Sequence, residues 1–143
     1  MASKPETTFY TSVHKHLPPP SKLYRVKMSN PYVAGIPDYW YSGPKADLWI
    51  EWKFIVLPKR DDTVIDLCGG KQPTISALQQ DWIKERLDEG RNVWVIVGHK
   101  NGGRICSAAY LWQLLLSAAE FCKYSLSRAD LAQTILRHTG TRS

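Results

Sequence analysis

The sequence is poor in cysteine and histidine, and this excludes several kinds of site. Its three cysteines are far apart and form no CxxC pair, so neither a zinc site nor a disulfide framework is indicated. We expect buried thiols in a reducing compartment. The histidines show no metal-ligand or nucleophile spacing, and we expect each at the surface or in contact with a phosphate. They are His14, His16, His99 and His138.

The sequence also lacks long apolar runs and has few acidic residues. No run approaches the length of about 20 residues that a membrane-spanning helix needs, and the N-terminus shows no apolar signal segment. We therefore expect a protein that is not secreted and has no membrane partner. Lys and Arg number 19 against 13 Asp and Glu, a net charge of +6. This excess favours an anionic partner, most often nucleic acid, although a basic protein without such a partner remains an alternative.

What is present is enough for one globular domain. The chain has 143 residues, of which 43% are hydrophobic, so it can bury a core. We expect a single domain over residues 1–143, with the core at about 3–107 and a helical extension at about 108–139.

Residues 35–54 organise the chain. They are predicted to form two strands joined by a turn at residues 42–45. Side chains alternate along the second strand, so one face is apolar and the other carries Asp47, Glu51 and Lys53. Charges on a strand this apolar need an explanation, because buried charges are costly unless they are paired or bound to metal.

The first strand of this hairpin offers a partner, Asp38. With the loop centred on residues 43–44, Asp38 lies opposite Trp49, on the same face as Glu51 and diagonal to it. Diagonal neighbours are about 7–8 Å apart at Cα, so the two carboxylates could share one cation. Asp47 is a rival ligand on this face, and a register slip of one residue would separate Asp38 from Glu51.

The sequence resembles the Pro-Asp…(Asp/Glu)-X-Lys nuclease superfamily in two short motifs. These are Pro37-Asp38 and, after a gap, Glu51-Trp52-Lys53. Together with Gly35-Ile36 and a downstream helix carrying Gln79, the pattern is most similar to virus-type replication-repair nuclease domains and archaeal-type Holliday junction resolvases. The resemblance covers roughly residues 6–98. It implies an α/β fold with a restriction-endonuclease-like core, in which helices flank a mixed central sheet, and extra helices follow at the C-terminus.

The resemblance also implies a site for Mg²⁺ (or Mn²⁺). Asp38, Glu51 and the backbone carbonyl of Trp52 would hold the ion through oxygen atoms, as hard cations prefer. Lys53 would position or activate the attacking water and stabilise the developing charge. In these families a glutamate on the first helix completes the site, and Glu6 is the candidate here. A capping box with Ser3 at the start of the predicted helix over 3–17 explains Glu6 equally well.

A helix is predicted over residues 75–89, beginning at Thr74 or Ser76 and ending at Gly90. Gln79 lies inside its apolar stripe, so its amide needs a partner. In the resembling nucleases a glutamine on this helix contacts the phosphate or a water at the metal. The alternative is a glutamine tolerated at the edge of the stripe. The stripe consists of Ile75, Leu78, Trp82 and Ile83.

Before the hairpin, the sequence predicts a helix over 3–17, a strand over 23–28 and a loop over 29–32. A second loop, at 58–73, is long enough to be functional or mobile. Basic residues around these elements could bind DNA phosphates, although lysines on a solvated edge strand are an alternative. The candidates are Lys15, Lys22, Arg25, Lys27, Lys59 and Arg60.

After the hairpin, residues 93–97 predict a central strand buried on both faces, joined to the hairpin by a βαβ crossover. Residues 108–123 predict a helix that is apolar nearly all round, either a core helix or a subunit interface anchored by Trp112 and Leu116. A last helix is predicted to begin at Ser127 and reach about residue 138.

These features predict a metal-dependent endonuclease that cuts branched DNA, Holliday junctions first, in the cytoplasm of a microbial or phage-infected cell. Resolving a junction needs two cuts, and a two-fold homodimer would supply two sites. Two alternatives stay open: a site-specific endonuclease of the homing or restriction type on the same core, and a non-catalytic DNA-binding module in which the charged residues form an ordinary ion pair.

Overall fold

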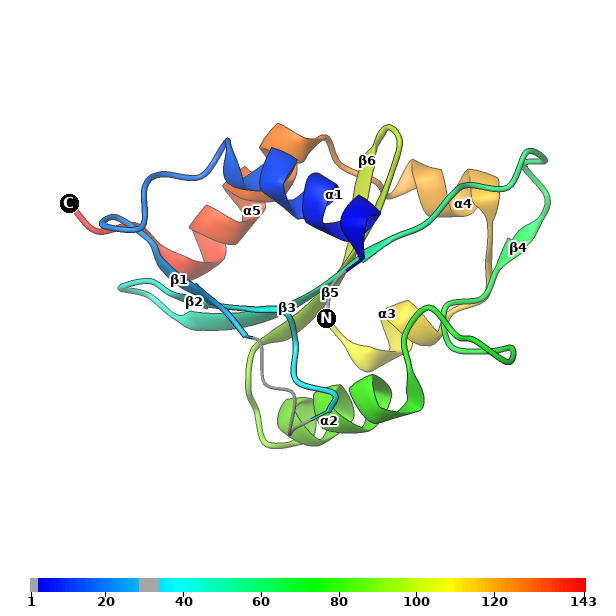
Figure 1. The fold of residues 1–143 in the computed structure, drawn as a ribbon, viewed down its shortest axis with the longest axis horizontal. Helices are drawn as coiled ribbons and strands as arrows, with labels where there is room; N and C mark the ends of the chain where they lie inside the picture. Colours follow the sequence, from blue (N-terminus) through cyan, green and yellow to red (C-terminus); the bar gives the residue numbers. More distant parts are fainter. Residues whose placement is uncertain (1–2, 29–33) are drawn as a thin grey trace.

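A computed structural model describes residues 3–28 and 34–143 and shows a five-stranded sheet with helices on both faces (Figure 1). The strand order is β1-β2-β3-β5-β6. β3 and β5 run parallel, and the other neighbours are antiparallel, so the sheet is mixed, as predicted. The strands are β1 (Tyr24–Lys27), β2 (Tyr39–Ser42), β3 (Asp47–Phe54), β5 (Val93–His99) and β6 (Gly102–Cys106).

One face of the sheet is covered by α1 (Lys4–His14) and α5 (Arg128–Thr139). Helix α1 begins with the predicted capping box between Ser3 and Glu6, and Ser127 begins α5 as expected. Helix α1 packs on β3 and β5, and α5 packs on α1 and β6. Both helices contribute apolar side chains to one buried cluster, including Phe9, Val13, Leu131 and Ile135. The predicted C-terminal helix is therefore part of the core rather than an appendage.

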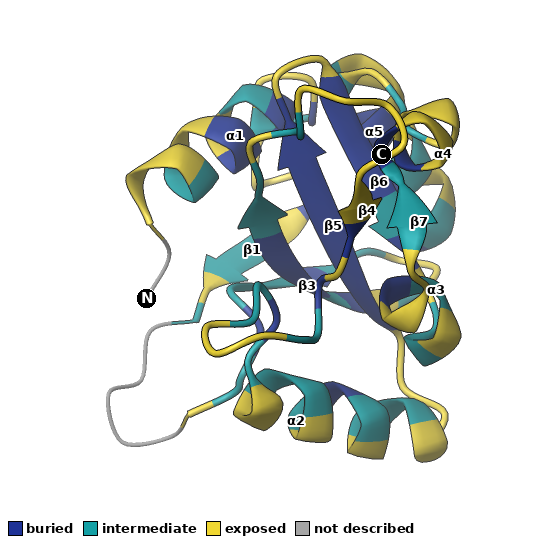
Figure 2. Cartoon of the chain, turned by 90° about the vertical axis from the view of Figure 1, so that its right-hand side faces the viewer, coloured by how far each residue is buried: buried dark blue, intermediate teal, exposed yellow. Residues whose placement is uncertain are grey.

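The opposite face is covered by α2 (Ala77–Asp88), α3 (Ala109–Gln113) and α4 (Ala118–Lys123). Their buried side chains form a second cluster with the odd-numbered residues of β5. All seven residues of β5 are buried (Figure 2), which confirms a strand covered on both faces. It is an interior strand, but the middle of the sheet is β3. The predicted crossover is present, since α2 lies between the parallel strands β3 and β5.

The predicted helix over 108–123 is wrong. The chain forms α3, leaves helical geometry at Leu114, pairs as β7 (Leu116–Ser117) with β4 (Val64–Ile65), and then forms α4. A new helix begins because the Ser117 side chain accepts from the Glu120 amide in a capping box. Trp112 is 1% exposed in the second core cluster, so it cannot anchor an interface, and Leu116 is half-buried in the β4–β7 pair.

The remaining segments differ from expectation in their lengths. Helix α1 ends at His14, three residues early, although Leu17 is still buried. The polar connection 58–73 includes β4, and its backbone carbonyls at Asp61 and Thr63 accept from the first amides of α4. The loop predicted at 29–32 lies outside the described residues.

No helix in the described part of the chain is long and apolar enough to span a membrane.

Candidate metal and catalytic site

The β2–β3 hairpin places Asp38 and Glu51 on one face of the sheet. Their predicted register is wrong by two residues: Trp40, not Asp38, pairs with Trp49, and Tyr39 pairs with Ile50. Extending this register by one position puts Asp38 directly across from Glu51. A shift of two keeps every side chain on its predicted face, since the side-chain period of a strand is two.

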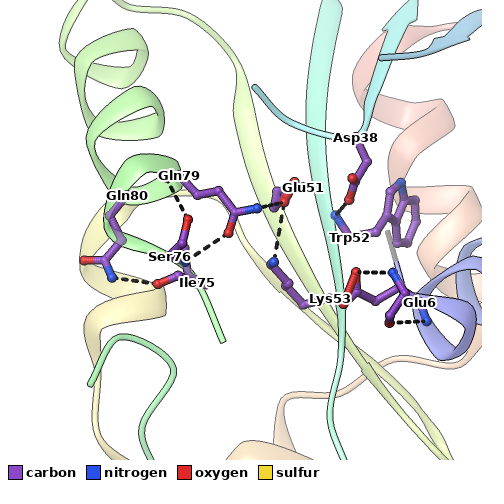
Figure 3. Close-up of polar contacts among 10 residues, drawn as sticks. Glu6, Asp38, Glu51, Trp52, Lys53, Ile75, Ser76, Gln79 and Gln80 are labelled. Carbon is purple, nitrogen blue, oxygen red and sulfur yellow. Dashed lines mark hydrogen bonds and ion pairs between the residues drawn. The ribbon is translucent and has the colours of Figure 1, made fainter. Parts of the chain in front are cut away.

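Glu51 is the buried centre of the site, at 1% exposure. Its Oε1 accepts a 2.6 Å hydrogen bond from Gln79 Nε2 and lies 3.6 Å from Lys53 Nζ (Figure 3). Its Oε2 is buried and accepts no hydrogen bond from an N–H or hydroxyl group of the described residues; in the metal-free protein, a proton shared with the Asp38 carboxyl can link the two side chains. Burial, and then the negative charge of Asp38, raise the pKa of Glu51 well above its usual value, while Lys53 opposes the shift.

Asp38 immediately precedes β2 and lies beside the backbone of β3. Its Oδ2 accepts a 3.0 Å bond from the Trp52 amide. Burial raises the pKa of Asp38, and this bond partly opposes the rise. The N–H and C=O of a strand residue point to the same edge, so the Trp52 carbonyl faces the edge of β3 where Asp38 lies.

These groups fit a hard divalent cation. Two carboxylates accompany one ammonium group, one carboxylate oxygen is unsatisfied, and a backbone carbonyl borders the same space. Oxygen donors of this kind are what Mg²⁺ and Mn²⁺ take. A cation would offset the negative charge that Asp38 and Glu51 carry when both are ionised, which Lys53 alone balances only in part.

Glu6 is not gathered with the two carboxylates. No three His, Cys, Asp or Glu side chains in residues 3–28 and 34–143 are arranged to hold a metal ion together. The Glu6 carboxylate accepts from the Ser3 amide at 3.3 Å in the capping box, and its negative charge adds to the raised pKa of Glu51. The capping role of Glu6 is therefore confirmed, and its role as a metal ligand stays a prediction.

Gln79 reaches Glu51 because it is the third residue of α2. Ser76 begins this helix, and the Gln79 Oε1 accepts from the Ser76 amide at 3.0 Å, which leaves the Nε2 free to bind Glu51. The predicted apolar stripe is partly wrong: Leu78 is 59% exposed, and Ile75 is buried but precedes the helix. The stripe residues that pack on the sheet from within the helix are Trp82 and Ile83.

A close backbone contact fixes the chain just before Asp38. Gly35 has φ +89°, and a Cβ there would lie 2.6 Å from the Leu78 carbonyl oxygen at the start of α2. Only glycine fits this conformation and this space. The contact holds the segment that carries Asp38 against the helix that carries Gln79.

The predicted basic residues do not form one patch around the carboxylates. Arg25 and Lys27 pair with Tyr41 and Tyr39, so they lie on the α1 face, opposite Glu51. The Arg25 guanidinium donates to the Pro18 carbonyl, and Lys27 lies 5.9 Å from the Tyr10 ring centroid.

The other basic candidates lie at the surface. Lys15, Lys22 and Lys59 are exposed. Arg60 makes a 2.8 Å ion pair with Asp62, which reduces the charge that it can offer to a phosphate.

His14 is not the surface residue that was predicted. Its Nε2 lies 2.8 Å from the Tyr41 hydroxyl, which accepts a 3.0 Å bond from the Trp52 indole directly behind the site. Burial, and then the positive charge of Arg25, lower the pKa of His14 to about 4. A neutral His14 accepts the Tyr41 proton, so the network is fully paired. The sequence could have indicated this burial, because His14 lies on the same face of the first helix as Tyr10 and Val13.

Comparison with known proteins supports the fold. No protein-family model matches the sequence, and no curated protein matches it. Among solved structures, the chain is similar to Hjc from Archaeoglobus fulgidus, described as a Holliday junction resolvase from an archaeal hyperthermophile. The TM-score is 0.51 and the identity 13%, over 92% of this chain and 98% of that one. At this identity the likeness concerns the fold, which is the restriction-endonuclease-like α/β fold with a mixed, helix-flanked sheet.

Proposed function

We propose that this protein is a Mg²⁺-dependent endonuclease that hydrolyses phosphodiester bonds in branched DNA. One observation carries the proposal: Glu51 is buried beside Asp38 and Lys53 with one carboxylate oxygen unsatisfied. A buried carboxylate of this kind costs stability unless it is protonated, paired or bound to a metal ion. Binding a divalent cation for phosphoryl chemistry meets this requirement.

Each residue of the site has a distinct task in this reaction. Asp38, Glu51 and the Trp52 carbonyl would hold the ion, which would neutralise charge at the scissile phosphate and activate water. Lys53, 3.6 Å from Glu51, orients the attacking water and stabilises the charge that develops on the phosphate oxygens. Gln79 fixes the Glu51 carboxylate through its 2.6 Å bond, as a partner behind a metal ligand does.

The branched substrate rests on the likeness to a Holliday junction resolvase and on the net charge of +6. Two opposed cuts need two sites, so we propose a homodimer. Its surface does not include Trp112, and the exposed apolar residues near Trp112 are Tyr110, Leu114 and Leu115. We place the activity in the cytoplasm of a microbial or phage-infected cell, where free thiols are stable.

Cleavage and binding by matched variants test the proposal. Asp38→Asn, Glu51→Gln and Lys53→Ala should each abolish Mg²⁺-dependent nicking while DNA binding is retained, because Lys and Arg contacts to phosphate supply most of the affinity. Lys100→Ala removes an exposed lysine that is not part of the Asp38–Glu51–Lys53 cluster and should cut normally. Cleavage that survives in Glu51→Gln would refute the assignment.

The choice of DNA substrate separates the open alternatives. Four-way junctions, flaps and linear duplexes of matched sequence should be compared at equal enzyme concentration. Preferential cutting of the junction, together with a dimer in sedimentation, is the expected result. Equal cutting of linear and branched DNA would favour a site-specific endonuclease, and binding without any cleavage would favour a DNA-binding module.

A further inference from the structure

A cavity of about 670 Å³ lies on the same face of the sheet as Glu51, towards the other end of β3. Three tryptophans from separate elements line it: Trp40 on β2, Trp49 on β3 and Trp82 on α2. Side chains of β3 alternate, so Trp49 and Glu51 project from the same face two residues apart, about 7 Å along the strand. The cavity therefore opens on the same sheet face as the candidate active site, about one nucleotide step from Glu51 along β3, although Asp38, Glu51 and Lys53 do not line it.

The three indole rings form an aromatic wall of inclined faces: the ring planes of Trp40 and Trp49 are 39° apart, and Trp82 packs edge-on to Trp49 at 64°. The ring centroids of Trp40 and Trp49 are 6.2 Å apart, and those of Trp49 and Trp82 are 5.5 Å apart. The Arg86 guanidinium lies 5.3 Å from the Trp82 ring centroid. All three tryptophans are only half-buried, so the wall leaves aromatic surface open towards the cavity. Flat aromatic ligands stack on such surfaces.

The polar groups of the cavity do not fit a phosphate. Its two arginines, Arg86 and Arg91, are matched by two carboxylates, Asp47 and Glu89. Arg86 is already paired with Glu89 at 2.8 Å. A phosphate would meet carboxylate repulsion without a free cluster of positive charge. A neutral, flat ring with donors and acceptors on its edges matches these groups instead.

The rim supplies hydrogen-bonding groups for such an edge. Asn92 uses its Nδ2 to bind the Asp47 carbonyl at 3.1 Å, which leaves its side-chain oxygen as an acceptor. The exposed Asp47 carboxylate is a second acceptor, and the exposed Arg91 is a donor. Nucleobases carry both kinds of group on their edges.

We propose that this cavity binds one unpaired nucleobase next to the phosphate that is cut. The inference rests on the proposed nuclease function and adds to it a base-binding subsite. Bases inside a duplex are stacked and cannot enter, whereas bases at a branch point or in a flap are free to leave the stack. The cavity would therefore favour DNA with unpaired nucleotides near the cleavage point.

Fluorescence of 2-aminopurine tests the proposal without requiring cleavage. The probe is placed at each unpaired position of a flapped duplex in turn and mixed with the cleavage-inactive Lys53→Ala protein. Stacking on tryptophan should quench the probe at one position near the branch. Trp40→Leu in the same background should abolish that quenching and weaken binding about tenfold, the low end of the range for base–aromatic stacking. Trp40→Phe should retain most of both effects.

Controls separate loss of the subsite from loss of fold or function. Tyr124→Leu replaces a 59% exposed aromatic residue outside the cavity and should leave quenching and binding unchanged, and thermal melting should show Trp40→Leu folded. An abasic nucleotide at the quenched position should weaken binding by the wild type but not by Trp40→Leu.

Equal quenching at all positions, or an abasic effect unchanged in Trp40→Leu, would overturn the proposed base-binding subsite even if the protein cuts DNA. Position-specific quenching without cleavage would retain the subsite and remove the nuclease.

Discussion

If Glu51 holds the proposed Mg²⁺ ion, replacing it by glutamine should make the metal-free protein more stable and remove the stabilisation that Mg²⁺ gives. Burial raises the pKa of Glu51 well above its usual value, which means that the fold favours the neutral carboxyl. The wild type should therefore lose stability as the pH rises from about 4.5, the ordinary pKa of the group, towards the raised value. Glutamine cannot ionise, so this part of the pH dependence should disappear in the variant.

The size of both effects can be estimated. Replacing a poorly compensated buried charge by a neutral isostere is expected to stabilise the metal-free protein by about 1 kcal/mol or more at neutral pH. Saturation with Mg²⁺ at about 100 times its dissociation constant should stabilise the wild type by about 2.7 kcal/mol. For a chain of 143 residues, this corresponds to a rise in Tm of about 9 °C, from a typical unfolding entropy of about 0.3 kcal/mol/K.

Thermal melting with and without Mg²⁺ measures these quantities directly. Wild type and Glu51→Gln are compared across pH 5 to 8, with Asp81→Asn as a control that neutralises an exposed carboxylate on the outer side of α2. The control should keep the full response to Mg²⁺. Two results would contradict this interpretation of Glu51 as a metal ligand whose burial costs stability in the metal-free protein. One is a Glu51→Gln protein that melts lower than the wild type without metal. The other is a Glu51→Gln protein that still gains several degrees from Mg²⁺.

Three further predictions concern the surroundings of the site. Gln79→Glu keeps an acceptor for the helix cap but loses the donor to Glu51, so cleavage should fall about 10–100-fold while circular dichroism shows α2 intact. The pKa of His14 is lowered to about 4, so the wild type should gain about 3 kcal/mol relative to His14→Phe as the pH rises from 4 to 6.5; parallel curves in urea unfolding would contradict this. Gly35→Ala should cost more stability than Gly90→Ala, since both positions have positive φ but a Cβ meets the Leu78 carbonyl only at Gly35; the excess should be about 1–3 kcal/mol, and equal losses would argue against the contact.

The sequence by itself determined the hairpin, the face of each of its side chains and the pair of carboxylates with their lysine. These follow from local rules: turn residues end strands, and side chains alternate with a period of two. Helix-capping patterns located the capping box at Ser3 and the start of the last helix at Ser127. The box between Ser117 and Glu120 was also readable, but the long apolar pattern around it favoured one continuous helix.

Tertiary structure decided the strand register, which set Asp38 across from Glu51 rather than diagonal to it. It also decided on which face of the sheet the basic residues of β1 lie. Arg25 and Lys27 pair with Tyr41 and Tyr39 of β2, so their side chains lie on the α1 face. Pairing across strands depends on the packing of whole faces, and no short pattern encodes it.

Tertiary structure alone brought together groups that are distant in the sequence. The unsatisfied oxygen of Glu51 depends on which neighbours bury it, and the His14–Tyr41–Trp52 network joins α1 to two strands. Trp40, Trp49 and Trp82 meet around one cavity only because α2 crosses back over the sheet. Each tryptophan alone is an ordinary apolar residue of its element. That the three line one cavity depends on the distances between elements, which only the folded chain defines.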